Sequence, residues 1–94
     1  MAVAVTVRIK IPAMFQSATG GAKTAEVEGG TVGECLKALS VRFPALKRML
    51  FDEGDNFSGY LNVMVNGQSV LGNLYAIPVK AGDELYPLIM IEGG

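Results

Sequence analysis

The sequence predicts an α+β fold, a roll in which one main helix covers a mixed sheet of four or five strands. Apolar residues alternate with polar or small residues over positions 3–11 and again over 61–65, which is the period of a strand with one buried face. A helical pattern lies between these segments, over positions 31–43. The order strand, strand, helix, strand, short strand, strand therefore leaves one amphipathic helix to cover one sheet.

The first two strands are expected over residues 3–11 and 23–28. In the first, every odd position is Val or Ile, and Pro12 ends it because proline has no N–H to donate to a sheet. A loop that contains Gly20-Gly21 follows. The second strand is short and polar enough to be a sheet edge.

The helix is expected to begin at Thr31. Thr31 and Glu34 have the spacing of a capping box, in which the hydroxyl and the carboxylate accept hydrogen bonds from backbone N–H groups of the first turn. Pro44 ends the helix after Phe43, and residues 45–51 are expected to add a further turn or two. One apolar stripe runs along the helix at Val32, Leu36, Leu39 and Phe43.

The second half of the chain contains a predicted hairpin and the last strand. Asn66-Gly67 supplies the two positive φ angles of a type I′ turn after the strand 61–65. Residues 71–79 are ambiguous, with Pro78 arguing against a central strand, and the last strand is expected over 84–91. Because the first and last strands are the most apolar, we expect them to be central, adjacent and parallel.

Length and composition narrow the possible partners. The 94 residues make a single domain, 1–94, and the charge of −1 with no cluster of Lys or Arg indicates neither nucleic acid nor an anionic membrane. No apolar run approaches the ~20 residues of a membrane span, and the first residues lack the features of a signal peptide. We therefore expect a cytoplasmic protein that binds proteins or small molecules.

Histidine is absent, and cysteine occurs once, at Cys35. The absence of histidine removes the commonest general base and the commonest metal ligand, so no metal site is expected. Cys35 lies beside the apolar stripe of the helix and has no histidine to activate it. Packing in the core is the preferred interpretation of this residue.

The last predicted strand runs directly into Glu92-Gly93-Gly94. Two glycines lose more conformational entropy on ordering than any other pair, which indicates a requirement that only glycine meets, such as passage through a narrow channel. A frayed end is the alternative interpretation of the same two residues.

The order of these motifs resembles the β-grasp, ubiquitin-like fold. Within that fold, the residues are similar to the prokaryotic sulfur-carrier family that includes MoaD, ThiS and CysO, and most similar to its longer MoaD-like and CysO-like members. The resemblance spans nearly the whole chain. It is carried by 5–12, Gly29-Gly30-Thr31-Val32-Gly33-Glu34, 61–67, Ala81-Gly82-Asp83-Glu84-Leu85 and Gly93-Gly94.

The resemblance implies a carrier or substrate protein and not an enzyme, or else the small subunit of a molybdopterin-synthase-like complex. A MoeB/ThiF-like adenylating enzyme, which itself uses ATP and Mg, would adenylate the carboxylate of Gly94, and sulfur would replace AMP to give a thiocarboxylate. The acceptor would be a synthase or large subunit in molybdopterin-like cofactor or cysteine biosynthesis. No cofactor would be bound by this chain.

Gly93, on the same resemblance, would keep a flexible tail unobstructed. Residues 91–94, if extended at ~3.3–3.6 Å per residue, can reach roughly 12–14 Å into a partner's active site.

The last strand is apolar on both faces, although one helix can cover only one of them. The set Tyr86, Leu88 and Met90 is therefore a candidate docking patch for the activating enzyme and the acceptor. Phe57, Tyr60 and Met64 are candidates to extend it, with Met14 as a further one. The alternative is a strand buried on both sides by loops.

Two other functions share these residues. A ubiquitin-like protein modifier would be joined to lysines through the same adenylated C-terminus. A β-grasp interaction module would have no chemistry at Gly94, and the two terminal glycines would then be incidental.

Overall fold

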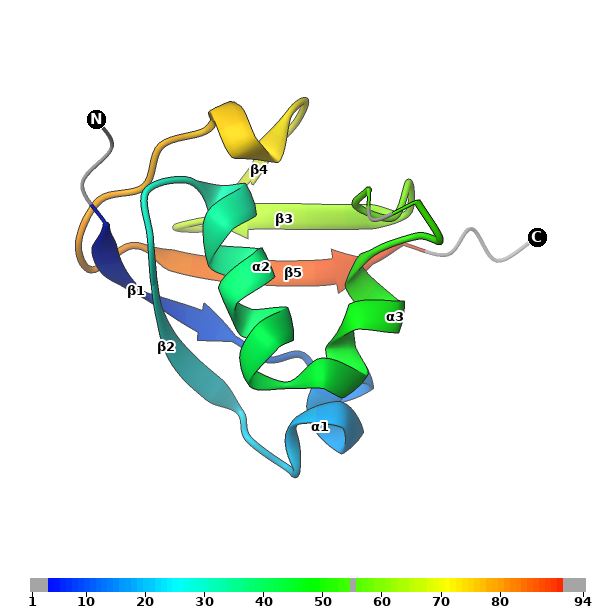
Figure 1. The fold of residues 1–94 in the computed structure, drawn as a ribbon. Coiled ribbons are helices and arrows are strands. Elements are labelled where there is room, and N and C mark those ends of the chain that lie inside the picture. The colour runs from blue at the N-terminus through cyan, green and yellow to red at the C-terminus, as the bar shows by residue number, and fades with distance from the viewer. Residues whose placement is uncertain (1–3, 55, 91–94) are drawn as a thin grey trace.

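A mixed sheet of five strands in the order β2-β1-β5-β3-β4 forms the centre of the fold (Figure 1). The computed structural model describes residues 4–54 and 56–90. The strands are β1 Val5–Lys10, β2 Thr24–Gly29, β3 Leu61–Val65, β4 Gln68–Val70 and β5 Glu84–Ile89. The helices are α1 Ala13–Gln16, α2 Val32–Arg42 and α3 Lys47–Leu50, with 3₁₀ turns η1 Ser17–Thr19, η2 Pro44–Leu46 and η3 Leu74–Ala76. The predicted α+β class and the number of strands are confirmed.

The central position of β5 follows from its pairing on both sides. It is parallel to β1, with Ile9 opposite Leu85, and antiparallel to β3, with Val63 opposite Pro87. β1 pairs in turn with β2, which forms an edge of the sheet. The predicted parallel contact between the first and last strands is confirmed, as is the edge position of the second strand.

Pro87 lies inside this central strand, where a proline normally removes a ladder hydrogen bond. The ladder between β1 and β5 contains two residue pairs and stops at Leu85, before Pro87 is reached. The missing N–H of Pro87 therefore interrupts no pairing with β1, while its buried ring packs in the core.

Helix α2 begins with the predicted cap, in a variant form. The Glu34 backbone N–H donates to Thr31 Oγ1 at 3.1 Å, and Glu34 Oε1 accepts from the Gly30 N–H at 2.8 Å. In the usual capping box the carboxylate bonds the N-cap residue itself, here Thr31, so the second bond lies one residue earlier. Both bonds fix the direction in which the chain enters the helix.

The core lies between α2 and the sheet. Figure 1 shows α2 and α3 in front of the sheet, so both helices lie on the same side of it. The most deeply buried side chains include Ile9, Leu36, Leu39, Leu46 and Leu85. The turns predicted over residues 45–51 are η2 and α3, which bury Leu46 and Leu50.

The structure corrects the sequence interpretation in two places. The connection after β1 was expected to be a loop, but it contains α1 and η1, because Phe15 of α1 is buried in the core. The last strand was expected over 84–91, but it ends at Ile89, and residue 91 lies outside the described residues.

Within residues 4–54 and 56–90, none of the helices has both the length and the apolar character needed to cross a bilayer.

Candidate functional site

The described part of the chain ends at Met90, and this residue is held in place. The Met90 N–H donates to the carbonyl oxygen of Tyr60 at 2.7 Å, one position beyond the last strand pair, Leu61 opposite Ile89. Gly93 and Gly94, the predicted reactive residues, lie outside the described residues. The structure therefore fixes the point from which the last four residues start.

Three of the predicted docking residues share one face of the sheet. Tyr86 and Leu88 alternate along β5 with the buried Leu85 and Pro87, so they point away from α2. Met64 is paired directly with Tyr86 across β3 and β5. We call Met64, Tyr86 and Leu88 the open face, because the described helices α2 and α3 lie on the opposite side of the sheet (Figure 1).

Polar and charged side chains border the open face. On the β1 side, the Lys10 ammonium lies 5.8 Å from the centroid of the Tyr86 ring and 3.9 Å from a Glu84 carboxylate oxygen. On the β4 side, Ser69 Oγ donates to Asn62 Oδ1 at 2.7 Å. An apolar centre with a polar rim is the usual composition of a protein-binding surface.

Tyr60 and Met90 continue the register of the open face by one pair at its C-terminal end. Both side chains are well exposed, at 65% and 57%. The structure does not bring Phe57 to this surface: its ring stacks on Phe51 with centroids 4.6 Å apart. Met14 lies in α1 and is also not part of the open face.

The turn at Asn66, between β3 and β4, meets the turn over residues 80–83 and fixes the start of β5. The sequence interpretation missed this contact. Asn66 Nδ2 donates to Asp83 Oδ1 at 2.9 Å, while Asn66 Oδ1 accepts from the Glu84 N–H at 2.9 Å. Asp83 Oδ2 also accepts from the Lys80 N–H at 2.8 Å. The hydrogen bonds from Lys80 and Asn66 lower the pKa of Asp83 below its usual value. Asn and Asp were recognised in the sequence as turn residues, but the bond between them joins positions far apart in the chain.

Cys35 is fully buried on α2. Burial, with smaller contributions from the charges of Glu34 and Asp83, raises the pKa of its thiol to about 11. Cys35 also belongs to no group of three or more potential metal ligands in the part of the chain that the structure describes. A thiol with this pKa is protonated at neutral pH, which agrees with a packing role and argues against a nucleophilic one.

Comparisons of sequence and of structure give different results. No protein-family model matches the chain, and no curated protein matches its sequence. Several solved structures do match over almost the full length of both chains.

Matches above 25% identity include the following three. The solution structure of small archaeal modifier protein 1 (SAMP1) from Methanosarcina acetivorans is 28% identical, with a TM-score of 0.86, covering 98% of this chain and 99% of that one. SAMP1 from Haloferax volcanii is 29% identical, with a TM-score of 0.81 and coverage of 95% and 99%. A chain in the BexX/CysO complex of Amycolatopsis orientalis is 34% identical, with a TM-score of 0.79 and coverage of 94% and 99%. The predicted β-grasp, ubiquitin-like fold is confirmed.

Proposed function

Because this chain belongs to the family of ubiquitin-like sulfur carriers and modifiers, we propose that it is a sulfur carrier and that its reactive group is the carboxylate of Gly94. In this proposal the chain is a substrate of other enzymes and catalyses nothing itself. The single observation that supports the position of the reactive group is the anchoring of β5, which pairs with β1 as far as Leu85 and is held on its β3 side up to Met90.

The chemistry needs two displacements. A carboxylate oxygen of Gly94 attacks the α-phosphorus of ATP, and pyrophosphate leaves, so that the carboxyl carbon becomes a good electrophile. A sulfide then attacks that carbon, AMP leaves with the oxygen, and a thiocarboxylate remains. The adenylating partner, a MoeB/ThiF-like enzyme, supplies ATP and Mg, so this chain contributes only the acyl group and binds no cofactor.

Glycine suits the end of such a tail. A tail that enters the active site of an enzyme passes close to its walls, and Gly93 and Gly94 have no Cβ to clash there. Because Met90 is fixed by its bond to Tyr60, the reach of the tail depends only on residues 91–94. Removing or adding one residue would displace the carboxyl carbon by ~3.3–3.6 Å, which is enough to take it out of attack distance.

The open face, together with Tyr60 and Met90, is the proposed docking surface for the adenylating enzyme and for the sulfur-accepting synthase or large subunit. Its apolar centre of Met64, Tyr86 and Leu88 lies on the strand that leads to the tail. A partner that covers this surface would therefore lie at the start of the tail. The similar Amycolatopsis chain comes from a complex of BexX with CysO, which supports a protein partner here. We place this function in the cytoplasm, where ATP is available.

A second candidate function is that of a protein modifier, joined to lysine side chains through the same adenylate. The similarity to two proteins described as small archaeal modifier proteins favours it. The two functions share the adenylation step and differ in the nucleophile that displaces AMP, which is sulfide in one case and a lysine amine in the other.

Adenylation can be tested by ATP–pyrophosphate exchange with the adenylating enzyme of the same host. We expect exchange that depends on this chain and that is lost when Gly94 is deleted or when one alanine is added after it. Thermal unfolding of both tail variants should match the unaltered chain, because the change lies beyond β5, the last strand, which ends at Ile89. Full exchange with the truncated chain would contradict the proposal.

A further inference from the structure

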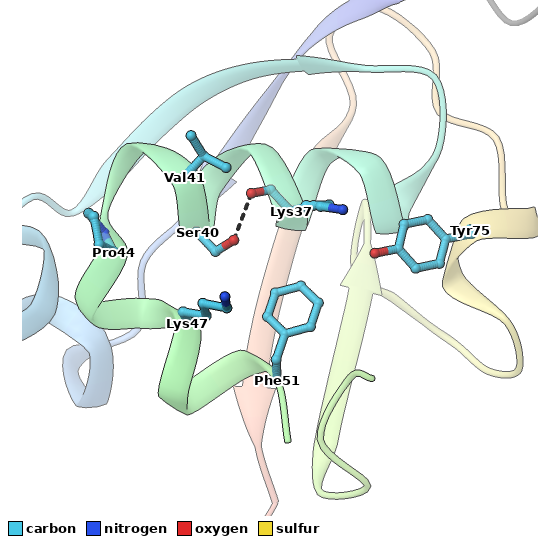
Figure 2. A pocket seen from close by; sticks show the side chains of 7 residues that line it. All are labelled: Lys37, Ser40, Val41, Pro44, Lys47, Phe51 and Tyr75. Carbon is cyan, nitrogen blue, oxygen red and sulfur yellow. Dashed lines mark hydrogen bonds between the residues drawn. The ribbon is translucent and has the colours of Figure 1, made fainter. Parts of the chain in front are cut away.

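A pocket of about 300 Å³ lies on the helix side of the molecule, away from the open face. Figure 2 shows that α2 provides Lys37, Ser40 and Val41, while Tyr75 reaches the pocket from η3. Pro44 and Lys47 come from the turns that follow α2, and the Phe51 ring lies among them. None of these residues belongs to the proposed docking surface, which is the open face with Tyr60 and Met90.

The apolar part of the pocket is aromatic and well supported. Phe51 is only 8% exposed and stacks on Phe57, with ring centroids 4.6 Å apart. Phe57 also contacts Tyr75, at 5.3 Å between centroids. Tyr75 remains 43% exposed, and Val41 is 73% exposed at the opposite rim. The pocket therefore presents a buried aromatic ring between two accessible apolar side chains.

A close contact holds Tyr75 in position. A Cβ placed on Gly33 would lie 2.6 Å from Tyr75 Cδ1 and 2.9 Å from the Tyr75 backbone nitrogen. Gly33 is in the first turn of α2, where glycine costs up to about 1 kcal/mol relative to alanine. Because glycine has no Cβ, η3 can approach α2 closely enough to place Tyr75 at the pocket.

Among the residues that the structure describes, the charged side chains that line the pocket are all basic. Lys37 and Lys47 line it, and none of its described lining residues is acidic. Within the described residues the Lys37 ammonium forms no ion pair. The Ser40 hydroxyl already donates to the Lys37 carbonyl oxygen at 2.7 Å. A ligand that fits this lining carries negative charge beside an apolar group.

We propose that this pocket binds a short acidic segment of a partner protein, with an apolar side chain against Phe51 between Val41 and Tyr75 and a neighbouring carboxylate facing Lys37. The volume is at the lower end of the ~300–1,000 Å³ typical of small-molecule pockets, and its rim is exposed, so one anchoring side chain fits better than an enclosed small molecule. Because the pocket and the open face lie on opposite sides of the sheet, a partner can occupy one while the other is also occupied.

The test is a titration of the ¹⁵N-labelled chain with the acetylated, amidated peptide EDFDE, followed by NMR. We expect saturable shifts at the amides of Lys37, Val41 and Tyr75. The uncharged peptide QNFNQ should bind about threefold to tenfold more weakly, as loss of one or two partly exposed ion pairs predicts. Absence of saturable shifts at these three amides, or saturable shifts at Met64 and Tyr86 in their place, would overturn the proposal.

Matched variants separate a specific site from general charge attraction. Lys37→Gln should weaken binding of EDFDE about threefold to fivefold. Arg48→Gln removes the same charge from a neighbouring residue that lies outside the lining of this pocket, and it should leave the affinity unchanged. Equal weakening by both variants would contradict a site at Lys37. The spectrum of each variant shows directly whether it is folded.

Discussion

The Met90 N–H and the Tyr60 carbonyl oxygen are 2.7 Å apart and join the last described residue to the residue before β3. This bond continues the antiparallel pairing of β5 with β3 past Leu61 and Ile89. The end of β5 is thus held against its neighbour, and the exposed Tyr60 and Met90 side chains border the open face at the same point. A partner that docks on the open face would therefore meet the start of the tail in a fixed position.

The first prediction concerns docking on the open face. Met64→Gln and Leu88→Gln each replace a partly exposed apolar side chain by a polar one of similar length, so neither should unfold the domain. Each should weaken binding of the adenylating enzyme by about tenfold, which is the loss of a moderate interface anchor. Surface plasmon resonance with the immobilised enzyme measures this loss.

Met14→Gln is the matched control, since it makes the same change at an exposed methionine in α1. It should leave the affinity within twofold, roughly the size expected for a surface change away from an interface. An equal loss for Met14→Gln and Met64→Gln would show that the open face is not the docking surface.

The second prediction concerns the contact of Gly33 with Tyr75. Gly33→Ala should improve intrinsic helix propensity by up to about 1 kcal/mol, but the added Cβ meets the Tyr75 ring and backbone. Because overpacking costs about 1–3 kcal/mol, we expect a net loss of stability and a displaced Tyr75. Urea unfolding measures the first effect, and the shift of the Tyr75 amide in NMR spectra measures the second.

Gly59→Ala is the control for steric conflict. A Cβ on Gly59 meets nothing within 4 Å, and its φ is not in the left-handed range. The change should be neutral or should stabilise the domain by up to about 1 kcal/mol through the unfolded state. If Gly33→Ala left the free energy of unfolding as little changed as Gly59→Ala does, this result would contradict the close packing of η3 on α2.

The third prediction is that the contribution of Asp83 to the free energy of unfolding depends on pH. Hydrogen bonds from the Lys80 N–H and the Asn66 side chain lower the pKa of Asp83 in the folded state, so its carboxylate stabilises the fold above the unfolded-state pKa. That contribution is lost as the pH falls through the folded-state pKa. Since the Asp83 side chain is only partly buried, its hydrogen bonds are partly screened by solvent, and we expect Asp83→Asn to cost below about 1 kcal/mol at neutral pH.

Urea unfolding of the unaltered chain and of Asp83→Asn, between neutral pH and strongly acidic pH, measures the difference between their free energies of unfolding. The difference should stay constant down to about pH 5 and shrink below about pH 4, where the carboxylate of the unfolded chain takes up a proton. A difference that grows on acidification would have the wrong sign for a lowered pKa.

The fourth prediction concerns Cys35. Burial raises the pKa of its thiol to about 11, so almost no thiolate is present at pH 8 and the reagent cannot reach it. Iodoacetamide should therefore leave the folded chain unmodified and should alkylate Cys35 completely in concentrated urea. Mass spectrometry measures both states, and rapid alkylation of the folded chain would contradict the packing role.

Much of the fold could be predicted because local patterns and tertiary packing agree. The alternation in β1 matches its one buried face, and Asn66 and Gly67 adopt the predicted positive φ angles of 51° and 85°. The cap of α2 is likewise encoded by neighbouring residues, Thr31 and Glu34. Each of these elements depends on interactions within a few positions of the sequence.

The features that escaped prediction depend on distant contacts. α1 is four residues long, too short for a helical period, and exists because Phe15 reaches the core. Phe57 was a candidate for the docking patch, but its position is set by the rings of Phe51 and Tyr75. The same limit applies to Gly33, because no local pattern indicates which segment approaches a glycine.

The carboxylate of Gly94 is the centre of the proposed function, and the mass of the C-terminal peptide isolated from the native host tests it most directly. Our account predicts a peptide that ends at Gly94 and in which one oxygen has been replaced by sulfur. A terminus that remains unmodified when the adenylating enzyme and ATP are present, or a chain that continues beyond Gly94, would contradict it. A Gly94 carbonyl found only in amide bonds to lysine would favour the modifier in place of the carrier.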